Sequence, residues 1–283
     1  MKIQVALVYV LFTMPISAAA LALHGVLHSM PALPTPTAMP AWALHAGAPT
    51  VSPAPIDQAA APHGHGAASA ATANLDPDDD WIVGPPEVIE QCEAALEQAG
   101  VTFTESRIPV HRSKSGTHVC GAEQVVRVAK TPGGIQWGRG RSGPKIACGM
   151  GMALIAFETI VLEEAQAHFG KDVVRVEHMG TYNCREMAAY PGWVSEHSYA
   201  NALDIKAFVL EGGTSISVLD DWTLPTKGRV TKAQRAAASF LREVSRRAYE
   251  EEVFSVVLTP AFDRAHRNHF HLDLARYRVD GSH

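Results

Sequence analysis

A long proline-rich stretch near the N-terminus limits the fold more than any other feature of the sequence. Residues 21–80 are dominated by Ala, Pro, His and Gly and show no sustained apolar period. Proline is excluded from helix interiors and from central strands, and segments of this composition behave as extended linkers. We therefore expect a disordered Ala/Pro/His-rich linker over residues 21–80 and one folded domain over residues 81–277. The prolines that carry this argument are Pro31, Pro34, Pro36, Pro40, Pro49, Pro53 and Pro55.

The first twenty residues are typical of a secretory signal peptide. Lys2 supplies the positive start, residues 5–15 form an apolar run, and residues 17–20 (SAAA) offer a cleavage site. The apolar run is shorter than the roughly 20 residues that a membrane span needs. We therefore expect a periplasmic or secreted protein. An uncleaved membrane anchor stays an alternative, because apolar residues continue at Leu21, Leu23 and Leu27.

The four cysteines are consistent with an exported protein. Cys92, Cys120, Cys148 and Cys184 are even in number, and no two are spaced as CxxC, which argues against a four-cysteine zinc site. In an oxidising compartment they predict two disulfides, and the alternative is four buried thiols. Three pairings are open from sequence alone. We favour Cys92 with Cys120 and Cys148 with Cys184.

Apolar periodicity in the last two thirds of the chain predicts an α+β fold. Helices are expected over residues 87–99, 148–169 and 232–249, and Gly170 is a natural stop for the second. Strands are expected over residues 101–104, 124–129, 173–178, 201–210, 254–258 and 269–274. Residues 132–144 are expected to be an irregular loop, and residues 220–222 a turn with Trp222 in the core. Without a βαβ rhythm, this order indicates a small antiparallel sheet flanked by helices.

The net charge of −5 argues against a nucleic-acid partner, since such proteins need a basic face. It is compatible with a peptide or glycan substrate. We expect a monomer.

Two segments carry residues suited to chemistry. In residues 195–204 (SEHSYANALD), His197 precedes Asp204, which lies early in an apolar strand. A carboxylate in such a setting is costly unless it is paired or bound to a cation. Taken alone, this pair is weak evidence, because a surface pair or a turn-capping Asp would look the same.

The second segment, residues 266–273 (HRNHFHLD), is more informative. Because side chains alternate along a strand, His269, His271 and Asp273 should share one face and Phe270 and Leu272 the other. A third imidazole, His266, lies just upstream. Three histidines within six residues favour a metal or proton-transfer site over a solvated face.

The two segments together supply two imidazoles and a carboxylate, which are ligands that zinc accepts. Three protein ligands plus water are typical of a catalytic zinc site, whereas structural sites have four protein ligands. Imidazole argues against calcium or magnesium. We therefore expect Zn²⁺ on the face of the sheet.

These segments, with residues 180–185 (GTYNCR), resemble the bacterial extensin-like C-terminal domain family over roughly residues 90–273. The chain is also similar to the broader D-Ala-D-Ala metallopeptidase, murein endopeptidase and hedgehog-type zinc fold. Ala200 stands where that superfamily usually has Gly. The resemblance implies zinc ligation by His197, Asp204 and His271. It also implies that His269 lies unligated in the active site and that Arg185 faces substrate. His266 matches an additional active-site histidine of the murein endopeptidase branch.

One departure bears on the mechanism. The dipeptidase branch of that superfamily has a general-base Glu where this chain has Asn268, which cannot take a proton. We therefore expect His269 to transfer the proton, because histidine titrates near neutral pH. Arg185 would bind a carboxylate or the developing negative charge, and Asp273 would orient an imidazole. Glu196 is an alternative acid or base, although a solvent-facing position is expected for it.

The sequence thus predicts a secreted zinc-dependent peptidase that acts on peptidoglycan stem or cross-link peptides, with zinc-bound water as nucleophile. Because the general-base Glu is missing, a second hypothesis remains: the domain is a zinc-containing module that binds cell-wall peptides or glycans without turnover. A structural wall protein, suggested by the linker, would leave the histidine cluster unexplained.

Overall fold

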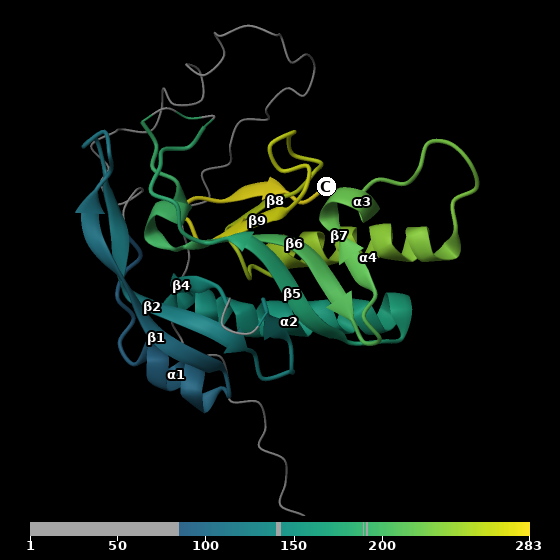
Figure 1. The fold of residues 1–283 in the computed structure, drawn as a ribbon, viewed down its shortest axis with the longest axis horizontal. Helices are drawn as coiled ribbons and strands as arrows, with labels where there is room; N and C mark the ends of the chain where they lie inside the picture. Colours follow the sequence, from purple (N-terminus) through teal and green to yellow (C-terminus); the bar gives the residue numbers. More distant parts are fainter. Residues whose placement is uncertain (1–84, 140–142, 189, 191) are drawn as a thin grey trace, which may run out of the picture. The chain divides into compact units, whose positions relative to one another are not determined.

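The structure is a computed structural model that describes residues 85–139, 143–188, 190 and 192–283 (Figure 1). The expected signal peptide and linker, residues 1–20 and 21–80, lie outside the described residues. In the described part of the chain, helices and strands form a mixed α+β fold, as expected. No helix within these ranges combines the length and apolarity needed to cross a membrane.

The sheet is larger than expected and is not purely antiparallel. The described residues contain ten strands in one sheet, and the main path runs β1-β2-β3-β5-β6-β9-β8-β10. β3 runs parallel to β5, and β10 runs parallel to β8. The expectation missed four short strands that apolar periodicity cannot reveal, because two or three residues do not establish a period. They are β3 (Gln136–Trp137), β4 (Lys145–Ala147), β7 (Ser215–Ser217) and β10 (Val279–Gly281), the last of which follows residue 277.

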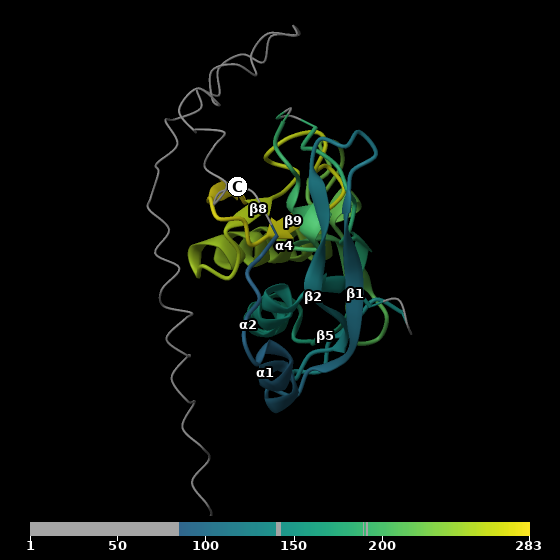
Figure 2. The ribbon, with the colours of Figure 1, turned by 90° about the vertical axis from the view of Figure 1, so that its left-hand side faces the viewer.

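One edge of the sheet is a long two-stranded ribbon (Figure 2). β1 (Thr102–Arg112) pairs antiparallel with β2 (Val119–Lys130), and both strands are longer than the segments 101–104 and 124–129 expected from sequence. The outer part of β1 is mostly exposed, and the outer part of β2 contains the small residues Gly121 and Ala122, so apolar alternation could not mark either. β4 pairs with the other side of β2.

Three helices cover one face of the sheet (Figures 1 and 2). They are α1 (Cys92–Gln98), α2 (Cys148–Phe169) and α4 (Lys232–Glu250). α2 has the expected bounds, and Gly170 ends it in the left-handed region at φ 63°. α4 begins with a capping box, in which the Thr231 side chain and Gln234 satisfy each other's backbone N–H groups.

The central strands β5 (Val173–Gly180), β6 (Ala202–Leu210) and β9 (Phe270–Asp273) present alternating faces. Phe208 of β6 packs against Phe157 of α2 and Phe240 of α4, with ring centroids 6.5 and 5.2 Å apart. Burial of each such aromatic side chain stabilises the fold by about 2–3 kcal/mol. The helices thus lie on the face to which Phe208 points. β6 has a register shift between Ile205 and Ala207, so alternation counted from Phe208 does not run on to Asp204. Leu203 and Ile205 of β6 and Phe270 and Leu272 of β9 lie in the same core, so Asp204 and His271 between them point to the opposite face.

The favoured disulfide pairing is wrong. The structure joins Cys92 to Cys148 and Cys120 to Cys184, with no free cysteine among the described residues. Proximity along the sequence suggested the other pairing, but tertiary packing decides it. The first bond ties α1 to the first turn of α2, and the second ties β2 to the segment after β5.

The chain between β6 and α4 also differs from the expectation. Residues 220–222 do not form a simple turn, because α3 (Val218–Asp221) is a one-turn helix capped by the Ser217 hydroxyl. Trp222 is buried, as expected, and its ring packs against Phe270. After α4, β8 (Val256–Leu258) pairs with β9. These contacts fix the inner face of β9 and so direct its other side chains away from the core.

Candidate metal centre

His197 lies in a short 3-10 helix, η2 (Glu196–Tyr199), that leads into β6. The turn ends at Ala200, whose φ of 53° lies in the left-handed region. A side chain there costs roughly 1–2 kcal/mol, so Ala200 carries strain that a Gly would not. The His197 ring is buried, and its Nδ1 lies 3.2 Å from the Thr181 carbonyl oxygen. With a proton on Nδ1 it donates to that oxygen, so the lone pair of Nε2 is directed toward β6 and β9.

Asp204 and His271 lie directly opposite each other across β6 and β9. Asp204 Oδ1 is 3.1 Å from His271 Nδ1 and 3.2 Å from His197 Nε2, and these two nitrogens are 3.1 Å apart. Ligands at the corners of a zinc tetrahedron with bonds near 2.05 Å are separated by about 3.3 Å. The three residues that the sequence singled out as ligands therefore meet and could hold a metal ion.

Asp273 fixes the orientation of His271. Its Oδ2 lies 2.8 Å from His271 Nε2, so this nitrogen donates to the carboxylate and Nδ1 is left to face Asp204. The expectation that Asp273 orients an imidazole is met by His271. A carboxylate behind an imidazole ligand increases its basicity and holds its ring.

Electrostatics favour a cation at this point. Burial would raise the pKa of Asp204, but hydrogen bonds from His197 and His271 outweigh it and lower the pKa. Burial would lower the pKa of His271, but the bonds to Asp204 and Asp273 raise it to about 10. In the metal-free protein a proton on His271 thus takes the place of a positive ion between the carboxylates of Asp204 and Asp273, and a metal would have to displace it.

The other two histidines adjoin the three. His269 Nε2 lies 3.6 Å from Asp204 Oδ1, and the His266 ring centroid lies 5.2 Å from that of His269 and 5.9 Å from that of His271. Burial lowers the pKa of both His266 and His269. Each is therefore neutral at pH 7 and able to accept a proton. The Asp263 carboxylate, 2.7 Å from His266 Nδ1, holds that ring.

Sequence reasoning did not identify Asp263 as part of the site, although its spacing of three residues before His266 is that of a turn contact. It also did not identify the Thr181 carbonyl oxygen, since a backbone acceptor leaves no mark in a sequence.

Glu196 is not solvent-facing, contrary to the expectation. It is 4% exposed, and its Oε2 accepts a hydrogen bond from the Asn201 amide at 2.8 Å. Burial, together with the nearby Asp273 carboxylate, raises the pKa of Glu196 to about 8. The side chain turns inward because η2 packs against both β2 and β6. The sequence does not show this contact between distant segments, so an acidic residue in a loop was expected to be exposed.

The structure does not bring the Arg185 side chain into the cluster. That side chain is exposed and donates to the carbonyl oxygen of Glu186, while the Arg185 backbone N–H donates to Ser198 beside His197. His118, Cys120 and Cys184 form a second group of ligand-type side chains, but the disulfide occupies both sulfurs. The His197–Asp204–His271 group is thus the metal-binding candidate in the described part of the chain.

Comparison with known proteins gives one finding. No curated protein and no solved structure matches the chain. A family model described as extensin-like protein C-terminus matches residues 90–282. This range includes all four cysteines and both segments of the candidate metal centre. The chain therefore belongs to the extensin-like protein C-terminus family.

Proposed function

We propose that the described domain is a zinc-dependent peptidase that acts on peptidoglycan stem or cross-link peptides outside the cytoplasm. One observation carries the proposal: His197 Nε2, Asp204 Oδ1 and His271 Nδ1 lie 3.1–3.2 Å from one another. Two imidazoles and one carboxylate are the ligand set of a catalytic zinc site. The two disulfides are consistent with an extracellular or periplasmic protein.

Each residue around the three ligands would have a separate role in the reaction. A zinc ion bound there supplies a Lewis acid and lowers the pKa of coordinated water toward neutrality. His269, neutral at pH 7 because burial lowers its pKa, accepts a proton and later returns it to the leaving amine. Asp273 keeps His271 in the tautomer that directs Nδ1 at the site. His266 lies against His269 and supports the proton transfer.

Arg185 has a different place in the proposal. Its exposed side chain is free to approach a substrate carboxylate, and its backbone is tied to η2 through the Ser198 hydroxyl. Because the guanidinium does not touch the histidine cluster, we assign it to substrate binding and not to the proton transfer.

The second candidate function is a zinc-containing module that binds cell-wall peptides or glycans without turnover. Asn268 favours it, because the side chain at this position cannot act as a general base. Asn268 Oδ1 instead lies 3.0 Å from His269 Nδ1, which leaves His269 Nε2 directed toward Asp204. The same contact is compatible with His269 as the general base. It therefore does not distinguish the two functions, and an experiment has to.

The test is digestion of purified muropeptides by the zinc-loaded protein, followed by mass spectrometry. For the peptidase we expect products that vanish with a chelator and with His271→Ala. With His269→Ala we expect turnover about 10²–10⁴-fold slower at unchanged zinc content. His168→Ala, a substitution at the far end of α2, is the matched control. A zinc-loaded wild type that binds muropeptides and releases no product would establish the binding module instead.

A further inference from the structure

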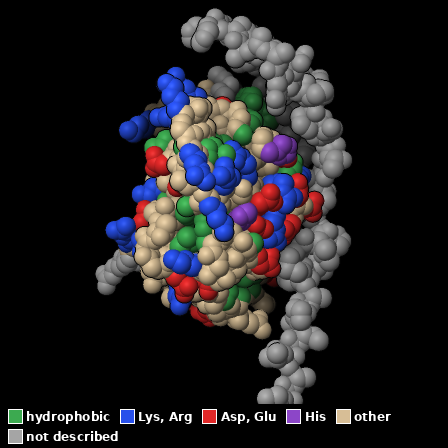
Figure 3. Space-filling view, turned by 90° about the vertical axis from the view of Figure 1, so that its right-hand side faces the viewer, with side chains coloured by type: hydrophobic (Ala, Val, Ile, Leu, Met, Phe, Trp, Pro, Cys, Tyr) green, Lys and Arg blue, Asp and Glu red, His purple; other side chains and the backbone are tan. Residues whose placement is uncertain are grey.

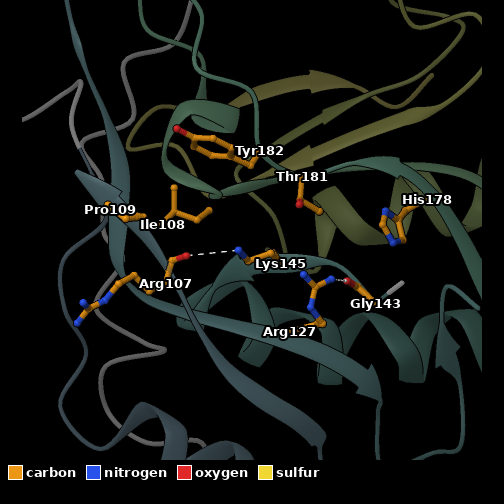
Figure 4. A pocket seen from close by; sticks show the side chains of 9 residues that line it. All are labelled: Arg107, Ile108, Pro109, Arg127, Gly143, Lys145, His178, Thr181 and Tyr182. Atoms are coloured by element: carbon orange, nitrogen blue, oxygen red, sulfur yellow. Dashed lines mark hydrogen bonds between the residues drawn. The ribbon is translucent and has the colours of Figure 1, made fainter. Parts of the chain in front are cut away.

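A pocket next to the metal centre is lined by three basic residues, Arg107, Arg127 and Lys145, and the last two have no acidic partner among the described residues (Figure 4). Its volume is about 490 Å³, within the range of ligand pockets. Arg127 of β2 and Lys145 of β4 both line it, and the two residues face each other in the antiparallel register of these strands. Like charges directly opposite on neighbouring strands destabilise a sheet. The pair therefore needs an explanation beyond folding.

Both cations are held in place by neutral acceptors. An Arg127 Nη1–H donates to the Gly143 carbonyl oxygen at 2.8 Å, and Lys145 Nζ donates to the Arg107 carbonyl oxygen at 3.3 Å. These bonds fix the two side chains but leave their charges uncompensated. In the described part of the chain no Asp or Glu forms an ion pair with either residue, and the pocket lining contains no carboxylate.

Arg127 and Lys145 differ from other basic side chains of this protein, which has a net charge of −5, because they face each other without an acidic partner among the described residues. On the face drawn in Figure 3, Lys and Arg side chains occur in several places and acidic side chains are also present. Glu177 of β5 illustrates the usual arrangement, since Arg139, Arg175 and Lys206 all pair with it. Exposed basic side chains as such therefore do not mark a binding site, whereas an unpaired cross-strand pair in a pocket does.

The pocket and the metal centre share a wall. Thr181 lines the pocket, and its carbonyl oxygen is the acceptor for His197 Nδ1. On the other side, the backbone N–H of Ala147, two residues after Lys145, donates to the carbonyl oxygen of Ala200 at 2.8 Å. Two strand residues span about 7 Å. The pocket therefore lies beside the segment that carries His197.

Strand alternation places both sites on the same face of the sheet. Val126 and Ile146 lie in the core under the helices, so their neighbours Arg127 and Lys145 point to the opposite face, as Asp204 and His271 do. Figure 4 shows Arg127, Lys145 and Thr181 converging on the pocket, while the Arg107 side chain turns away from its centre. Ile108 and Tyr182 supply apolar surface beside the cations.

We infer that this pocket binds a carboxylate of the peptide substrate and so positions the chain of that peptide at the metal centre. The inference rests on the proposed function, since peptidoglycan stem peptides carry several free carboxylates. A guanidinium and an ammonium that line one pocket complement a carboxylate, and charge-assisted hydrogen bonds to it are about twice as strong as neutral ones. The adjoining apolar surface suits short aliphatic side chains next to that carboxylate.

Binding, measured by calorimetry on the zinc-loaded protein, tests the inference independently of turnover. The probes are a soluble stem tetrapeptide with free carboxylates, the same peptide with its carboxylates amidated, and inorganic phosphate. Wild type should bind the acid form about tenfold or more tightly than the amide form. Arg127→Gln and Lys145→Gln should each remove most of this preference. Removing one of two like charges should leave the melting temperature unchanged or raised, so loss of fold is not expected.

Arg229→Gln and Lys232→Gln, at exposed cations in the segment before and at the start of α4, are the matched controls and should keep the preference. Equal binding of acid and amide by wild type, or a preference that survives in both pocket variants, would overturn the inference. So would phosphate binding as tight as that of the acid peptide. If the preference depends on Arg127 and Lys145 but no peptide is cleaved, the pocket is supported and the peptidase proposal alone fails.

Discussion

The Nδ1 atom of His271 lies 3.1 Å from Oδ1 of Asp204, and the two residues face each other across the β6–β9 ladder. Residues 67 positions apart in the chain are thus held together by backbone hydrogen bonds, independently of any bound ion. Because the two ligands are already in position, metal binding does not have to offset the loss of conformational entropy that ordering them would require. The predictions below follow from this arrangement and from the side chains that support it.

Replacing a ligand should abolish metal binding without unfolding the protein. Asp204→Asn and His271→Ala each remove one of three ligands, and we expect zinc content to fall from about one per chain to near zero. Elemental analysis after dialysis measures this, with His168→Ala as the control for the loss of an imidazole elsewhere. Stoichiometric zinc in both ligand variants would mean that the ion binds somewhere else.

Asp273 should tune the affinity for the metal without being a ligand. It accepts from Nε2 of His271 at 2.8 Å, and loss of such a partner weakens metal binding by about 10–100-fold. We therefore expect Asp273→Asn to bind zinc more weakly in a competition titration with a chromophoric chelator, but to retain one site per chain. Asp273→Glu should recover part of the affinity. An unchanged dissociation constant in Asp273→Asn would show that His271 needs no such support.

The metal-free domain should lose stability as the pH rises. The pKa of His271 is raised from 6.5 to about 10, so its contribution is complete below pH 6.5 and is lost as the pH rises through about 10. The pKa of Glu196 is raised from 4.5 to about 8, so the cost of burying its charge grows between these values. Asp204 acts in the opposite sense, because its lowered pKa adds stability above its ordinary value of 3.8.

The melting temperature of the chelator-treated protein between pH 5 and 10 tests this expectation. Glu196→Gln should remove the decline between pH 5 and 6.5 and make the decline between pH 6.5 and 8 shallower, and it should leave the part due to His271 between pH 6.5 and 10. Zinc affinity should rise over the same range, because the ion competes with the proton on His271. A melting temperature that stays constant from pH 6.5 to 10 in wild type and variant would contradict both assignments.

Much of the site followed from local periodicity. The alternation in HFHLD placed His269, His271 and Asp273 on one face, and the apolar strand around Asp204 marked a carboxylate that needed a partner. These inferences concern neighbours in one strand, where side-chain direction depends on sequence position alone. α2 was likewise predictable, because a long apolar segment ending at Gly170 has few other solutions.

The remainder depends on contacts between distant segments. Glu196 is buried because η2 packs against two strands, and the Arg127–Lys145 pair arises from the register of β2 and β4. Neither relationship leaves a local pattern. Strands of two or three residues, such as β3 and β10, also leave no local pattern in the sequence. They are strands because they pair with β5 and β8, and not because of their own composition.

The Cys92–Cys148 disulfide should contribute substantially to stability. It joins residues 56 positions apart, and cross-linking a loop of that length lowers the entropy of the unfolded chain enough to stabilise the fold by about 4 kcal/mol. The bond lies where α1 packs on α2, and a Cβ added at Gly151 would meet the Leu96 side chain at 3.3 Å, so the two helices are already close without it. We therefore expect the double variant Cys92→Ser with Cys148→Ser to fold with its metal centre intact but to unfold at lower urea concentration. Urea denaturation and zinc content together measure this.

Peptide mapping without reduction checks the pairing itself. Recovery of a Cys92–Cys120 peptide from wild type would show that α1 is joined to β2 and not to α2.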